Sequence, residues 1–244
     1  MDPKYCYPDS NVLVNKLDIR DAETLCKIER NITYGKTLQL LKDSSSIKLM
    51  DGFSCLKAIH NYLFGDIYTF AGKVRDVDIA KGNLFCKAIY IDEQAKFIFR
   101  KLEKDNFLKG LYKEPFISKL ADYMADVNAL HPFREGNGRT QRIFFSVLSN
   151  KAGYHIDFAA MNKEDLLKAD IAGMRGDTQP LKQLLSVHCA DLSLELGKLI
   201  EAGLADPKDI NKFNEIQEQR LGRSIDTVKE FSQDMFYLSQ DLTR

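Results

Sequence analysis

Residues 131–142 read HPFREGNGRTQR, and they decide the fold because a histidine, an acid, glycines and arginines stand within one short stretch. Gly136 and Gly138 flank Asn137 where a helical pattern begins, and this pattern runs to about Ala152. The first turn of a helix leaves backbone N–H groups unpaired and carries a partial positive charge, so a glycine-rich start binds phosphate. The stretch therefore predicts a phosphate-binding helix start.

The charged side chains of the stretch suit the same ligand. Arg139 and Arg142 lie three residues apart, so they are predicted to share a helix face and to bind phosphate oxygens. A carboxylate among phosphates usually holds Mg²⁺, which makes Glu135 the candidate metal ligand. Histidine can accept a proton near neutral pH, which makes His131 the candidate general base. Together these residues indicate a nucleotide-handling active site.

The complete pattern resembles the signature of the Fic family, His-x-Phe-x-(Asp/Glu)-Gly-Asn-Gly-Arg-x-x-Arg, and every position is met. Family members similar to this chain transfer AMP from ATP to a Ser, Thr or Tyr hydroxyl of a target protein. The resemblance implies ATP and Mg²⁺ as cofactors, His131 as the base and Glu135 as the Mg²⁺ ligand. It assigns nucleotide binding to the loop that Phe133 would anchor in the core, namely Phe133, Gly136, Asn137, Gly138, Arg139 and Arg142.

The resemblance covers about residues 1–190 and predicts a mainly α fold, a Fic-type helical bundle with one β-hairpin flap beside the active site. Across residues 73–92 the helical period disappears, and apolar positions flank Lys81-Gly82-Asn83, as in two strands joined by a turn. In the family this flap holds the target protein by pairing its edge with an extended segment. The alternative is a small structural ribbon. Residues 191–244 are predicted to form a C-terminal helical extension.

Apolar spacing predicts further helices. One is expected from about Asp21, and another is expected to be capped by Asp92. A helix that starts at Pro115 is predicted to bury one face and to deliver His131 at its C-terminal end. No role is assigned to the other histidines, which lie far from the motif in the sequence: His60, His155 and His188.

Composition narrows the class of protein. The 244 residues include 35 Lys plus Arg and 35 Asp plus Glu, so no surface of one sign is indicated for nucleic acid or a membrane. No apolar run reaches the length of a membrane span, and the N-terminus has no apolar signal core. The five cysteines lack the spacing of a zinc site or disulfide framework. We therefore expect a cytoplasmic protein, and export by a specialised secretion system stays open.

The resemblance also implies how the activity is regulated. Family members are commonly inhibited by a helix with the pattern Ser/Thr-x-x-x-Glu-Gly/Asn, whose Glu pairs with the final motif arginine, here Arg142. This sequence lacks the pattern and so resembles bacterial toxins inhibited by a small antitoxin protein, which would supply a Glu to Arg142.

Two alternatives to AMP transfer are transfer of another phosphate-linked group, phosphoryl or phosphocholine, and a non-catalytic interaction module. Related phosphorylating proteins carry Lys in place of Gly138, and such modules usually lose the histidine or the acid.

Overall fold

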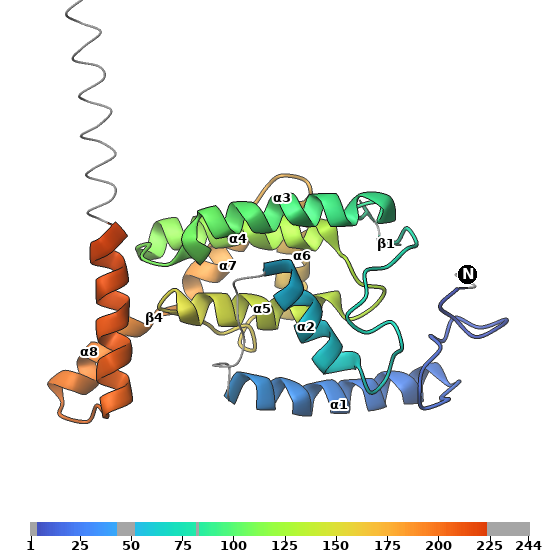
Figure 1. Cartoon of the computed structure of the whole chain (residues 1–244), viewed down its shortest axis with the longest axis horizontal. Helices are drawn as coiled ribbons and strands as arrows, with labels where there is room; N and C mark the ends of the chain where they lie inside the picture. The colour runs from blue at the N-terminus through green and yellow to red at the C-terminus, as the bar shows by residue number, and fades with distance from the viewer. Residues whose placement is uncertain (1–3, 43–51, 82, 224–244) are drawn as a thin grey trace, which may run out of the picture.

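The computed structural model describes residues 4–42, 52–81 and 83–223. This part of the chain is a mainly helical bundle, as predicted (Figure 1). Its elements, in chain order, are α1 (Ala22–Lys42), α2 (Gly52–Phe64), β1 (Ala80–Lys81), β2 (Asn83–Leu84), α3 (Ile91–Lys104), α4 (Lys113–Leu130), α5 (Asn137–Lys151), β3 (Tyr154–Ile156), α6 (Lys163–Met174), α7 (Gln179–Val187), β4 (Cys189–Asp191) and α8 (Leu192–Glu201). A further helix covers residues 207–223.

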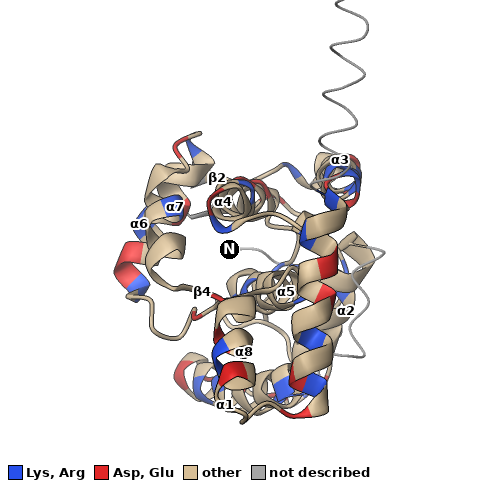
Figure 2. Cartoon of the chain, turned by 90° about the vertical axis from the view of Figure 1, so that its left-hand side faces the viewer, with Lys and Arg blue, Asp and Glu red and all other residues tan. Residues whose placement is uncertain are grey.

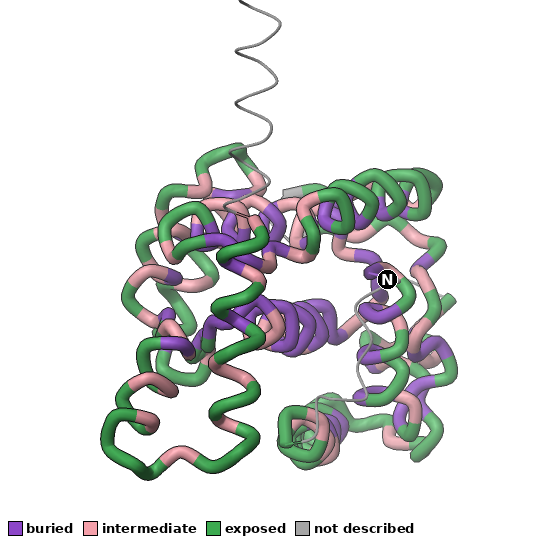
Figure 3. The backbone as a smooth tube through the Cα atoms, turned by 60° about the vertical axis from the view of Figure 1, so that its left-hand side comes forward, coloured by how far each residue is buried: buried purple, intermediate pink, exposed green. Residues whose placement is uncertain are grey.

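α5 runs through the centre of the bundle and is buried along most of its length (Figure 3). It packs against α2, α4 and β3. α4 buries Phe116, Met124 and their neighbours at helical spacing, as predicted, and it ends at Leu130, immediately before the motif. α5 begins at Asn137, inside the motif. The motif loop is therefore held at both ends by core helices.

The flap hairpin is present, but its paired strands are much shorter than the predicted residues 73–92. β1 and β2 pair antiparallel, with two residues in each strand. The carbonyl groups of Val77 and Cys86, on either side of the strands, accept hydrogen bonds from the side chain of Arg75. A side-chain donor therefore takes the place of a longer ladder at the base of the flap.

The second half of the predicted flap is helical. The 3-10 turn Ala88–Tyr90 leads directly into α3, which begins at Ile91 with Tyr90 as its N-cap. Asp92 lies in the first turn of α3, so its prediction as the cap was wrong. Alternation alone assigns Ile91 to a strand, yet its side chain starts the buried face of α3 together with Ala95. Burial against the bundle decides the outcome.

A second two-stranded sheet was not predicted. β3 pairs antiparallel with β4, and the helix over residues 207–223 contacts both strands through Arg220. The guanidinium of Arg220 donates to both carboxylate oxygens of Asp191, at 3.0 and 2.9 Å, and to the Tyr154 hydroxyl at 3.0 Å. These bonds join part of the predicted extension to the core. The division at residue 190 stays a proposal, and residues 224–244 lie outside the described part of the chain.

The surface and the helix lengths bear on possible partners. Within the described ranges, no helix is both long enough and apolar enough to cross a membrane. Basic and acidic residues are interspersed along the helices in the view of Figure 2. This arrangement agrees with the equal numbers of basic and acidic residues in the sequence. A charged ligand would therefore have to be recognised by a local cluster.

Candidate active site

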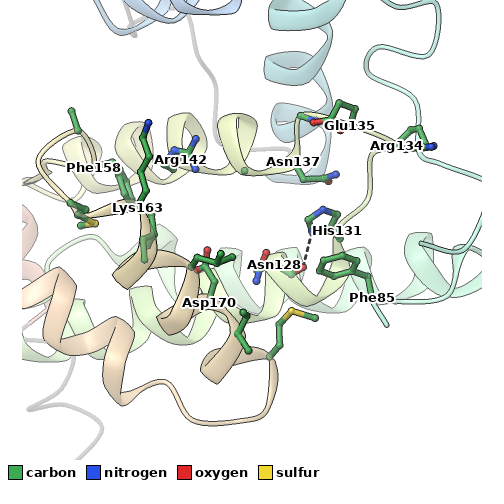
Figure 4. Close-up of a pocket in the computed structure, with 18 residues that line it drawn as sticks. Phe85, Asn128, His131, Arg134, Glu135, Asn137, Arg142, Phe158, Lys163 and Asp170 are labelled. Carbon is green, nitrogen blue, oxygen red and sulfur yellow. Dashed lines mark hydrogen bonds between the residues drawn. The ribbon is translucent and has the colours of Figure 1, made fainter. Parts of the chain in front are cut away.

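A cavity of about 640 Å³ lies where the motif loop meets α4 and α6. The motif contributes one wall, and α6 with the segment before it contributes the opposite wall (Figure 4). Polar groups line the motif wall, whereas most α6 residues in the lining are apolar. The motif residues in the lining are His131, Arg134, Glu135, Gly136, Asn137, Gly138 and Arg142, and the facing residues include Phe158, Met161, Lys163, Leu166, Asp170 and Met174.

His131 is held in an uncommon backbone conformation at the end of α4. Its φ of 43° and ψ of 60° lie in the left-handed region, which residues with a side chain rarely adopt. Its Nδ1 is 3.3 Å from the Asn128 carbonyl oxygen. Because a carbonyl only accepts, this contact needs a proton on Nδ1 and leaves the lone pair on Nε2. The flap residue Phe85 stacks on the imidazole with ring centroids 3.7 Å apart (Figure 4).

The loop between the two helices is closed by its own side chains. The Asn137 amide accepts from the Phe133 N–H at 2.9 Å and donates to the Phe133 carbonyl at 2.7 Å. Phe133 is fully buried, as expected of a residue that anchors the loop in the core. Gly136 has a φ of 80°, and a Cβ there would lie 2.3 Å from Cζ of Phe64. Glycine is therefore required at this position by both conformation and space.

Glu135 stands at the edge of the cavity, and its side chain is 44% exposed. Its Oε1 accepts from the Gly136 N–H at 2.9 Å, which orients the carboxylate beside the start of α5. Among the described residues, no three His, Cys, Asp or Glu side chains gather to hold a metal ion. A metal at Glu135 would therefore take its other ligands from a bound phosphate and water, as Mg²⁺ commonly does.

Arg142 faces the cavity opposite Asp170 of α6 (Figure 4). Burial lowers the pKa of the Arg142 guanidinium, and the charge of Asp170 opposes this change. Burial raises the pKa of the Asp170 carboxyl to about 6, although the charge of Arg142 acts in the other direction. A Cβ at Gly138 would lie 3.2 Å from Nη1 of Arg142, so the glycine leaves room for this side chain. The cavity thus presents a fixed cation beside a titratable acid.

Arg139 points elsewhere, toward α1. Its guanidinium donates to Oε1 of the buried Glu29 at 2.5 Å, to the Thr33 hydroxyl at 3.3 Å and to Oε1 of Glu135 at 3.4 Å. Glu29 also accepts a hydrogen bond from the Tyr68 hydroxyl. Arg139 borders a second cavity of about 490 Å³ between α1 and the loop, and it is absent from the lining of the first. The two arginines predicted to act together therefore have different surroundings.

His60 on α2, which was assigned no role from the sequence, lies directly behind the motif. Its Nδ1 accepts from the Gly72 N–H at 2.8 Å, so Nε2 carries the proton and donates to the Glu135 carbonyl at 2.9 Å. The ring stacks on Phe133 with centroids 3.9 Å apart. Burial lowers the pKa of His60 to about 4. One signal in the sequence could have indicated that His60 is buried: it follows Ile59 and precedes Leu63 on the apolar face of α2.

Three further residues beside the motif were not predicted. Phe85 and Asp170 line the cavity, and Glu29 holds Arg139. They reach the loop from the flap, α6 and α1, which are distant in the sequence. No local motif marks them, because their position follows from packing of whole elements.

Comparisons with known proteins place the chain in a family. The Fic/DOC family model matches residues 53–149. "Protein adenylyltransferase VbhT" of Bartonella schoenbuchensis is 32% identical over 244 residues, which are 100% of this chain and 48% of VbhT, so this chain spans about half of that relative. "Probable protein adenylyltransferase Fic" of Escherichia coli K12 is 36% identical over 186 residues, covering 76% of this chain and 90% of the relative.

Solved structures share the architecture. The BepC protein of Bartonella tribocorum, crystallised with bound AMPPNP, superimposes with a TM-score of 0.71 at 26% identity and covers 77% of this chain and 97% of its own. The type IV secretion system effector protein BepA superimposes with a TM-score of 0.70 at 27% identity, covering 84% of this chain and 74% of its own. The fold found here is therefore one that holds a nucleotide analogue in a similar protein.

Proposed function

Because this chain belongs to the Fic/DOC family, we propose that it transfers AMP from ATP to a Ser, Thr or Tyr hydroxyl of a target protein. One observation supports this most: a complete motif is folded so that His131 and the start of α5 border the same cavity. A base and a phosphate-binding site on one cavity are what transfer at phosphorus requires. Relatives named as protein adenylyltransferases agree with this activity.

In the proposed reaction, Nε2 of His131 accepts the proton of the target hydroxyl while the hydroxyl oxygen forms a bond to the α-phosphorus of ATP. The bond from this phosphorus to the bridging oxygen breaks, and pyrophosphate leaves. Asn128 supports this role, because the bond from Nδ1–H fixes the tautomer with its lone pair on Nε2. The left-handed backbone of His131 places the ring at the cavity rim.

The phosphates would bind at the start of α5, where the first N–H groups have no partner within the helix. Gly136, Asn137 and Gly138 bring this backbone to the cavity, and Arg142 adds a guanidinium. Mg²⁺ would be held by Glu135 together with phosphate oxygens, and it would neutralise charge on the phosphates. Arg139, also predicted to bind phosphate, could do so only by leaving Glu29 or reaching past Glu135.

Label transfer from ATP tests the proposal. We expect label from the α-phosphate, and none from the γ-phosphate, to appear on a protein of a bacterial lysate when Mg²⁺ is present. His131→Ala should abolish the transfer, whereas His155→Ala, at an exposed position outside the site, should retain it. Label from the γ-phosphate alone would indicate a kinase. If label is transferred from neither the α- nor the γ-phosphate, a different donor or the non-catalytic interaction module is favoured.

The target protein is proposed to dock on the flap. An extended segment pairing with an edge of β1 or β2 would lie beside Phe85 and therefore beside His131. The short strands leave few backbone groups for this pairing. We infer that the flap aligns the target near the base and that other surfaces contribute to affinity.

An antitoxin partner remains part of the proposal, together with a role as a bacterial toxin. The second cavity is open to such a partner, and Arg142 borders it together with Glu135 and Arg139. A glutamate supplied there could pair with Arg142 and keep phosphate from it. Growth arrest by the wild type, absent in His131→Ala and relieved by a small protein encoded beside it, is the expected result. Transfer unaffected by any such protein would argue against this partner.

A further inference from the structure

Arg75 carries a charge in the interior of the protein, between the flap and the end of α4. Only 2% of its surface is exposed, and it is among the largest fully buried side chains described. Within the described ranges, no carboxylate lies at ion-pairing distance from Arg75, although Asp78 is close enough to influence it. Burial lowers the pKa of the guanidinium. A buried charge without an ion pair needs strong hydrogen bonds to offset its desolvation.

Those hydrogen bonds go to three backbone carbonyls. Nε of Arg75 donates to His131 at 2.9 Å, Nη1 donates to Val77 at 2.7 Å, and Nη2 donates to Cys86 at 2.5 Å. Val77 precedes the paired flap strands and Cys86 follows them. A single planar group therefore joins both arms of the flap to the main chain of the proposed base.

Neighbouring contacts strengthen the same connection. The Arg75 N–H donates to the Pro132 carbonyl at 2.9 Å, and the Cys86 N–H donates to the Ala129 carbonyl at 2.9 Å. Phe85, next to Cys86, stacks on the His131 ring (Figure 4). Because His131 has left-handed φ and ψ angles that cost energy for a non-glycine residue, the surroundings must hold it there.

We propose that Arg75 is a positioning residue that couples the flap to His131, so that a target segment docked on the flap meets the base at a fixed distance. This inference rests on the proposed AMP transfer. Arginine suits the task because its donors are fixed in one plane and point in different directions. A lysine ammonium is a single centre, and it cannot reach three separated carbonyls with the same geometry.

Arg75→Lys separates this role from nucleotide binding. Arg75 does not line the cavity, so we expect the affinity for a non-hydrolysable ATP analogue to stay within about two-fold. The kcat for AMP transfer to the target should fall by about 100-fold, because a displacement of about 1 Å at a reacting group costs this much. Arg100→Lys, at an exposed position on α3, is the matched control and should keep both values.

Hydrogen exchange supplies a readout that needs no activity. In the wild type, the Cys86 amide should exchange far more slowly than an open loop amide, because it bonds to Ala129. Arg75→Lys should raise this exchange by about ten-fold or more and leave the amides of α5 unchanged. If the wild type transfers no AMP, the proposed function fails, and the exchange result still decides whether Arg75 couples the flap to the loop.

Two results would overturn the proposal. One is a folded Arg75→Lys variant with wild-type kcat or wild-type exchange at Cys86. The other is an equal loss of nucleotide affinity, transfer and thermal stability, which indicates a general structural role. Should the variant fail to fold, the wild type still tests the inference, because exchange of the Cys86 amide at the rate of an open loop contradicts it.

Discussion

Arg139 and Arg142 lie one helical turn apart at the start of α5, yet they meet opposite conditions. On the α1 side, Arg139 already contacts Glu29, Thr33 and Glu135. On the α6 side, Arg142 faces a cavity and the Asp170 carboxyl, whose pKa is raised. Arg139 is therefore held by protein groups even though the second cavity borders it, whereas Arg142 borders both cavities.

The difference shows how one helix start can both support a site and bind a substrate. The α1 side includes His60, which holds the Glu135 carbonyl, and Phe64, whose ring lies 4.8 Å beneath the Arg139 guanidinium. These contacts fix the loop without entering the larger cavity. The contacts around Arg139 and the Glu135 carbonyl therefore help to preorganise the motif groups that face the larger cavity. Substitutions can perturb one side of the helix start at a time, and the response of the other side is measurable.

The largest effect is expected from replacing the two arginines separately. Arg142→Gln should lower AMP transfer by about 10² to 10³-fold, because a preorganised group facing the phosphates is lost. Arg139→Gln should lower thermal stability more than Arg142→Gln does, because it leaves the buried Glu29 without its cation. Label transfer and thermal unfolding on both variants test this comparison. Equal losses of transfer with equal stability would show that the two sides are not distinct.

Glu29→Gln perturbs the α1 side from the helix that holds it. We expect a loss of about 2 to 3 kcal/mol in the free energy of unfolding, because the hydrogen bonds that the Glu29 carboxylate accepts from Arg139 and from Tyr68 are weakened. Nucleotide affinity should remain near that of the wild type. Urea unfolding and nucleotide titration measure the two quantities. A rise in affinity would mean that Arg139, once released, reaches the phosphates after all.

His60 gives the α1 side a dependence on pH. Burial lowers the pKa of His60 to about 4, from an ordinary 6.5. Between these two pH values, His60 is protonated in the unfolded chain but neutral in the folded chain. Stability from this residue is therefore present above about pH 6.5 and is lost as pH falls toward 4. The expected loss between about pH 7 and pH 5 is about 2 kcal/mol.

The comparison of His60→Phe with the wild type measures this contribution. The variant should be less stable at neutral pH, because two hydrogen bonds are removed, but its stability should fall less on acidification. Urea unfolding at the two pH values gives both numbers. His155→Gln, exposed on β3, is the control and should retain the wild-type slope. A parallel slope in His60→Phe would show that another group causes the acid sensitivity.

The sequence predicted what is local and missed what depends on distant packing. The helix start at Gly136 follows from adjacent residues, so the motif predicted it. The closure of the loop by the Asn137 side chain was not predicted, although both of its partners belong to Phe133, four residues away. The spacing of the two arginines could not reveal their divergence, because Glu29 lies 110 residues from Arg139. The flap was overextended for a related reason: apolar alternation cannot show that Arg75 binds the carbonyls at its base. The sequence patterns therefore did not predict the roles of the buried polar side chains Glu29 and Arg75.

The smallest effect concerns the α6 side, where Asp170 faces Arg142. With a pKa raised to about 6, the Asp170 carboxyl is neutral below this pH and negative above it, near the place proposed for the phosphates. ATP affinity of the wild type should therefore fall, relative to Asp170→Asn, as pH rises from about 5 to 7, by about five-fold. Taking the ratio of the two affinities at each pH cancels the titration of the nucleotide itself. A constant ratio would show that Asp170 does not sense the phosphates, and a ratio changing the opposite way would mean that the carboxylate binds a group of the nucleotide.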